Sequence, residues 1–91
     1  MITTMDTYNF KVIIIQDEDG IFVADCPAIP GCHTQADTYE EAEKRIREVI
    51  NLCQKVAKKD KSYRESINFG DKPSTRFIGM TEIEIPRASF V

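Results

Sequence analysis

The sequence has no hydrophobic run of the ~18–20 residues that a helix needs to span a bilayer. Its N-terminus lacks the basic start and apolar stretch of a secretory signal peptide. Only three cysteines are present, and this odd, sparse set does not suit a secreted disulfide scaffold. We therefore expect a cytoplasmic protein with reduced thiols and no membrane association.

An excess of positive charge is also missing. The chain has 12 Lys and Arg residues against 15 Asp and Glu residues, which gives a net charge of −3. It contains no arginine-rich arm and no series of aromatic residues for stacking bases. Direct DNA or RNA binding is therefore not expected, whereas a mild acidic balance suits a basic protein partner.

What the sequence does contain is a set of short strand patterns and one long helix pattern. Apolar alternation predicts strands at 8–16, 21–26, 32–35 and 76–85, and helical spacing predicts a helix from Tyr39 to about Lys59. The polar segment 60–75 reads as a long connection that packs on the domain, and Pro86 ends the last strand. The predicted fold class is α+β in the order β-β-β-α-β. An antiparallel three-strand meander gains a fourth strand, and one helix packs on one face.

Turn residues separate these elements. The stretch from Asp17 to Gly20 predicts a hairpin turn, and Pro30-Gly31 fits the centre of a type II turn. Thr38 and Glu41 have capping-box spacing, in which the hydroxyl and the carboxylate each satisfy a free backbone amide. Three acid-first pairs at i,i+4 support the helix, namely Glu40–Lys44, Glu41–Arg45 and Glu43–Arg47.

The first strand is apolar on both faces, which is typical of a strand covered on both sides. Only one convincing helix is available to cover it. The second face therefore needs segment 60–75, a second copy of the chain or a different protein as its cover. We expect self-association into a dimer or tetramer.

No pattern of chemistry-bearing residues predicts catalysis, a metal site or a cofactor. Cys26 and Cys32 are separated by five residues, which is not the spacing of structural zinc, and adjacent strand residues Cys32 and His33 point to opposite faces. His33 has no identifiable nucleophile or orienting partner. The carboxylates of the 17–19 turn miss calcium-loop spacing, and no carboxylate lies on the first strand.

From Gly20 to about Cys53 the chain resembles the HicB family of antitoxins. The resemblance rests on an ordered set of positions: Gly20, Pro27, Pro30, Gly31, Cys32, Thr34, Gln35, Asp37, Thr38, Glu41 and Ala42. It implies a partial ribonuclease H-like domain over residues 8–86, with tails at 1–7 and 87–91. One departure is Ala36, where the family usually has glycine. Only six residues follow Ile85, so we expect no appended DNA-binding domain.

The resemblance implies that the protein binds and neutralises a HicA-type toxin, a small basic protein that cleaves messenger RNA. The acidic residues Asp17, Glu18, Asp19, Glu82 and Glu84 are our candidates for contact with such a partner. Two alternatives remain open. One is an orphan HicB-like module that self-associates without a toxin, and the other is a small hydrolase or metal protein.

Overall fold

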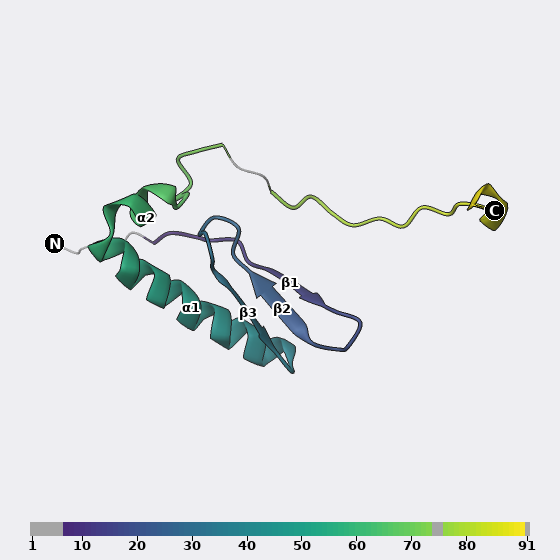
Figure 1. The fold of residues 1–91 in the computed structure, drawn as a ribbon, viewed down its shortest axis with the longest axis horizontal. Helices are drawn as coiled ribbons and strands as arrows, with labels where there is room; N and C mark the ends of the chain where they lie inside the picture. Colours follow the sequence, from purple (N-terminus) through teal and green to yellow (C-terminus); the bar gives the residue numbers. More distant parts are fainter. Residues whose placement is uncertain (1–6, 74–75, 91) are drawn as a thin grey trace.

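The computed structural model describes residues 7–73 and 76–90; the predicted N-terminal tail therefore lies, apart from Thr7, outside the described residues. Three strands come first in the chain and are followed by two α-helices and a 3₁₀ turn (Figure 1). Their bounds are β1 Ile13–Gln16, β2 Phe22–Asp25, β3 His33–Ala36, α1 Tyr39–Lys59, α2 Lys61–Ser66 and η1 Arg87–Phe90. The predicted α+β class and the three-strand meander are confirmed.

The strands form one antiparallel sheet in the order β1-β2-β3. Ile15 lies opposite Val23, and Val23 lies opposite Gln35. Gly20 has a φ of 85° in the β1–β2 turn, where glycine adopts a left-handed backbone without a steric penalty. Gly31 has a φ of 76°, and the Cys32 amide donates to the Ile29 carbonyl at 3.1 Å. This geometry is the predicted type II turn.

The first strand is shorter than the expected span of 8–16. Ile13 pairs with Asp25, and there β2 ends because Pro27 starts the turn toward β3. Residues before Ile13 therefore have no β2 partner. Tyr8 and Phe10 instead stack against Phe69, with ring centroids 4.8 and 6.0 Å away.

Helix α1 begins and ends where the sequence predicts and covers one face of the sheet. Ala42 and Ile46 of the helix pack against Ala24 and Ala36 of the sheet in the central core. The full buried set is Ala24, Cys26, Ile29, Cys32, Ala36, Ala42, Ile46, Ala57 and Ile67. No helix within the described ranges has both the length and the apolar character needed to cross a membrane.

The segment after α1, which is predicted to be a connection, contains a short helix. Asp60 caps α2 by accepting from the Tyr63 amide at 3.1 Å. The Tyr63 hydroxyl donates to the Pro30 carbonyl at 2.8 Å, and the Asn68 amide donates to the Ala28 carbonyl at 2.9 Å. The segment therefore packs on the end of the domain beside the proline turn, as expected, and does not cover the second face of the sheet.

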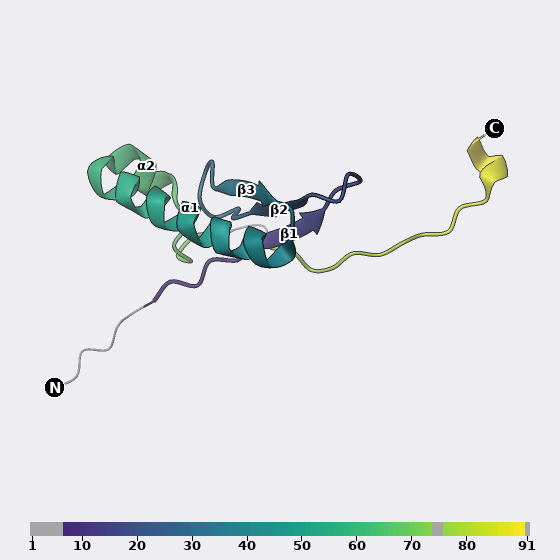
Figure 2. The ribbon, with the colours of Figure 1, turned by 90° about the horizontal axis from the view of Figure 1, so that it is seen from below.

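The prediction of a fourth strand is wrong for this structure. Residues 76–86 form no helix or strand, and Figures 1 and 2 both show them running away from the sheet and helices. A strand pattern becomes a strand only when another backbone accepts its hydrogen bonds. No strand lies beside this segment within the described ranges, and its apolar side chains are exposed: Phe77, Ile78, Met80, Ile83 and Ile85.

Candidate functional site

The residues of the family-like motif build the fold. Gly20 and Gly31 supply positive φ angles, Cys32 is buried beneath the turn, and Ala42 is fully buried against the sheet. The Cys26 amide donates to the Cys32 carbonyl at 2.9 Å and closes the base of the turn that contains Pro27 and Pro30. These structural roles explain the spacing of the motif. Surfaces for binding a partner are formed by other residues.

Half of the predicted capping box is present. The Thr38 hydroxyl accepts from the Glu41 amide at 3.1 Å, as expected. The Glu41 carboxylate instead lies 3.4 Å from the Arg45 guanidinium, and Arg45 donates to the Gln35 carbonyl at 2.9 Å. Glu41–Arg45 is the one predicted helix pair that forms an ion pair among the described residues. Arg45 is held by its hydrogen bond to β3, and the Glu41 carboxylate pairs with Arg45 instead of with the Thr38 amide at the helix start.

Three thiols gather beneath the proline turn. Cys26, Cys32 and Cys53 are free, and the first two are buried. Burial raises the pKa of Cys32 to about 12 and that of Tyr63 to about 12, and burial also raises the pKa of Cys26. Thiols with raised pKa values stay protonated and are poor nucleophiles and poor metal ligands at neutral pH.

No group of three His, Cys, Asp or Glu side chains within the described ranges could hold a metal ion. Cys32 is buried whereas His33 is exposed, so the two side chains point to opposite faces. His33 lies opposite Asp25 on the ladder, but no hydrogen bond joins the two side chains in the described part of the chain.

The five acidic contact candidates fall into two separate places. Asp17 has a structural role, because its carboxylate accepts from the amides of Asp19 and Ile21 at 2.9 Å each. Glu18 and Asp19 are exposed at the tip of the β1–β2 hairpin. Glu82 and Glu84 lie in the extended C-terminal segment, so one chain does not gather all five residues (Figure 1).

The sheet has an apolar face that α1 does not cover. Strand alternation places Ile13, Ile15 and Val23 on the side opposite Ala24 and Ala36, which face the helix. Ile15 is 53% exposed. Asp25, His33 and Gln35 give this face a polar margin toward β3. We call this surface the open sheet face.

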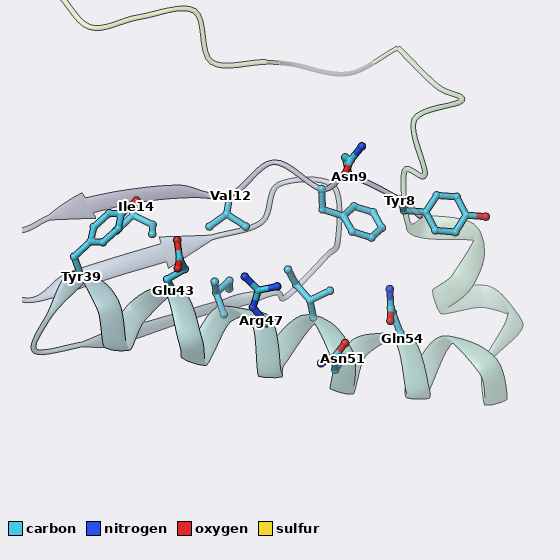
Figure 3. A pocket seen from close by; sticks show the side chains of 12 residues that line it. Tyr8, Asn9, Val12, Ile14, Tyr39, Glu43, Arg47, Asn51 and Gln54 are labelled. Atoms are coloured by element: carbon cyan, nitrogen blue, oxygen red, sulfur yellow. The ribbon is translucent and has the colours of Figure 1, made fainter. Parts of the chain in front are cut away.

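A groove of about 450 Å³ runs between β1 and α1. Its strand wall is apolar and includes Val12 and Ile14, which point toward the helix in Figure 3. The helix wall has apolar Ile46 and Ile50 at its base and a polar rim of Glu43, Arg47, Asn51 and Gln54. We call this feature the β1–α1 groove.

The sequence pattern does not predict this groove. Glu43 and Arg47 are exposed, as the helix pattern predicts, but they form no ion pair among the described residues and instead line the groove. The available signal was the apolar pattern from Tyr8 to Ile14, which continues beyond the residues that pair with β2. Residues 8–12 have no neighbouring strand in the sheet. The groove therefore stays open between this stretch and helix α1.

Comparison with known proteins gives a consistent set of relatives. The chain is 45% identical over 50 residues to a UPF0150 protein of Archaeoglobus fulgidus, an alignment that covers 55% of this chain and 72% of the relative. A UPF0150 protein of Synechocystis is 43% identical over 49 residues, covering 54% and 71%. One from Thermoplasma acidophilum is 46% identical over 51 residues, covering 56% and 74%. No family model and no solved structure matches the chain.

Proposed function

Because the chain belongs to the UPF0150 family, we propose that it is a HicB-like antitoxin that holds a HicA-type, mRNA-cleaving toxin in an inactive complex. The observation that carries the proposal is the open sheet face, an apolar surface on the motif-bearing domain that the chain's own helices leave uncovered. Exposed apolar patches of this kind are typical of protein-binding surfaces. The encounter would take place in the cytoplasm, where the three thiols stay reduced.

Negative charge next to the open sheet face supports a basic partner. Glu18 and Asp19 project from the hairpin that joins two strands of the open sheet face, and the chain carries a net charge of −3. Complementary charge steers association and selects partners, while the apolar centre supplies affinity. Glu82 and Glu84 are proposed as further acidic contacts. Binding is favoured over catalysis because the buried thiols are protonated and His33 has no hydrogen-bonded partner among the described groups.

The test is inhibition of RNA cleavage by the purified neighbouring toxin, the product of an adjacent gene encoding a short basic protein. Ile15→Lys should weaken inhibition at least about tenfold, because it places a charge at the centre of the open sheet face. Leu52→Lys is the matched control, since Leu52 is a 59% exposed apolar residue on α1 beside 53% for Ile15. Unchanged cleavage at molar excess of the wild-type chain would contradict the antitoxin role.

The second candidate function is an orphan module that self-associates without a toxin. The exposed apolar side chains of residues 77–85 favour it, because such a segment needs a binding partner of some kind. Gene neighbourhood distinguishes the two functions. The absence of any adjacent gene for a small basic, histidine-containing protein would favour the orphan module.

A further inference from the structure

The outer edge of β1 is open. The Asp17 amide donates to the Ile21 carbonyl at 2.9 Å, which sets the alternation of the hairpin ladder. By that alternation Ile14 and Gln16 direct their backbone groups away from β2, and no hydrogen bond to these groups is present among the described residues. An apolar edge strand without proline or charge is a template for another strand.

The opposite edge of the sheet is occupied at one carbonyl. The Arg45 guanidinium of α1 donates to the Gln35 carbonyl of β3 at 2.9 Å. Glu41 holds Arg45 in place from the same helix, at 3.4 Å. Among the described residues no side chain donates to the outer carbonyls of β1, so a strand that adds to this sheet meets no such obstacle there, next to the β1–α1 groove.

The C-terminal segment 76–85 has the pattern of a strand that fits this position. Its odd-numbered residues Ile83 and Ile85 alternate with Glu82 and Glu84, and Pro86 then ends the pattern. Ile83 is 76% exposed in the single chain. A strand added at β1 would place one row of side chains in the groove and the other on the side of the open sheet face.

An ordered turn at residues 68–72 precedes this segment in the chain. The Asn68 side chain accepts from the Gly70 amide at 2.9 Å, and the Lys72 ammonium donates to the Glu65 carbonyl at 2.7 Å. Beyond this turn the segment runs away from the domain (Figure 1). The radius of gyration is 17.6 Å, against about 12 Å for a compact domain of this length.

We propose that segment 76–85 of one copy adds as a strand along β1 of a second copy, with Ile83 and Ile85 in its β1–α1 groove. The exchange is reciprocal and produces a dimer in which each open edge is covered. Glu82 and Glu84 then lie on the same side as Lys11, the one charged residue between Tyr8 and Gln16. The exchange also brings these glutamates to the open sheet face of the partner. It does not depend on the antitoxin role.

The first experiment compares two isoleucines of the same segment by size-exclusion chromatography with light scattering. The full-length wild type should be a dimer. Ile83→Asp should weaken dimerisation at least tenfold, because it places a carboxylate in the groove. Ile78→Asp is the control: Ile78 is 81% exposed and lies on the opposite row, so the dimer should remain. A monomeric wild type, or equal effects of both substitutions, would overturn the proposal.

The second experiment separates exchange between copies from folding back within one chain. Val12→Arg blocks the groove and leaves the segment intact, whereas Ile83→Asp does the reverse. Each variant alone should be monomeric and folded by circular dichroism, and an equimolar mixture should form a heterodimer through one intact junction. A mixture that stays monomeric would contradict exchange between copies. If Val12→Arg does not fold, Asn51→Trp replaces it, because Asn51 is an exposed groove residue on α1.

Discussion

The folded domain and the C-terminal segment contain similar apolar residues, which are buried in the domain and exposed in the segment. Ile67 is 1% exposed and follows α2, whereas Ile83 is 76% exposed in a segment with an equally clear strand pattern. Ile67 is held because the neighbouring Asn68 amide donates to the Ala28 carbonyl, which docks the chain on the proline turn. The segment has no such anchor among the described residues. An apolar pattern shows which side chains gain free energy from burial. Whether they are buried depends on a hydrogen-bonded backbone partner that holds the segment on the domain.

The largest difference between the two regions should appear when buried and exposed isoleucines are truncated. Ile67→Ala removes a buried side chain and should lower the free energy of unfolding by about 2–5 kcal/mol. Ile78→Ala in the segment should change it by less than about 0.5 kcal/mol. Urea denaturation followed by circular dichroism measures both. Comparable losses would show that the segment is packed as tightly as the domain.

Glycine substitutions sharpen the comparison at the level of the backbone. Gly31 has a φ of 76° and nothing within 4 Å of an added Cβ, so Gly31→Ala tests conformational strain alone. We expect a loss of about 1–2 kcal/mol of unfolding free energy. Gly79→Ala is the control, because Gly79 has no positive φ and has equal space. A neutral Gly31→Ala in the same denaturation assay would contradict the type II turn.

Threonine substitutions make the same comparison for a single hydrogen bond. Thr38→Ala removes the cap of α1, in which the hydroxyl accepts from the Glu41 amide at 3.1 Å. The expected loss is about 1 kcal/mol. Thr7→Ala, at an exposed position outside every helix and strand, should have no measurable effect on the thermal midpoint. If Thr38→Ala also leaves the thermal midpoint unchanged, the hydrogen bond of Arg45 to β3, and not the Thr38 cap, stabilises the start of the helix.

The smallest effect should come from alkaline pH and should be confined to the domain. The pKa of Cys32 is raised from 9.0 to about 12, so the folded state keeps a proton that the unfolded state loses. This contribution to stability is fully present below pH 9 and declines as pH rises from there toward 12. Denaturation midpoints should therefore be flat from pH 7 to 8.5 and lower at pH 9.5.

Two variants check the origin of that alkaline decline. Cys32→Ala should reduce the slope above pH 9, because the shifted thiol is removed. Ile83→Asp should preserve the slope, since residues 76–86 contain no cysteine or tyrosine. A slope that is the same in all three proteins would assign the decline to other groups.

The sequence predicted best where the controlling interactions are local. The bounds of α1 follow from Thr38 and the apolar stripe, and both glycine turns follow from backbone angles that glycine favours. Helix α2 was missed although Asp60 is a suitable cap, because a helix of 6 residues shows too little periodicity to separate it from a polar loop. The capping box was half wrong because Arg45 also contacts a strand that only folding brings near.

The candidate surfaces were less predictable than the fold. The apolar character of both faces of the first strand indicated that a cover was needed, and the open sheet face agrees with this expectation. The β1–α1 groove could not be located, because its walls come from two elements that pack across the domain. The acidic candidates were chosen by charge alone, and Asp17 turned out to stabilise the hairpin turn.

The turns, the long helix and the alternation of apolar residues follow from the sequence alone, because each depends on backbone angles and on neighbours a few positions away. The point where β1 stops pairing, the bond from Arg45 to the edge of β3, and the departure of residues 76–86 from the domain are visible only in the folded structure. These outcomes depend on hydrogen-bond partners from distant parts of the chain. The same strand pattern is therefore paired in β1 and β2 and exposed at the C-terminal end.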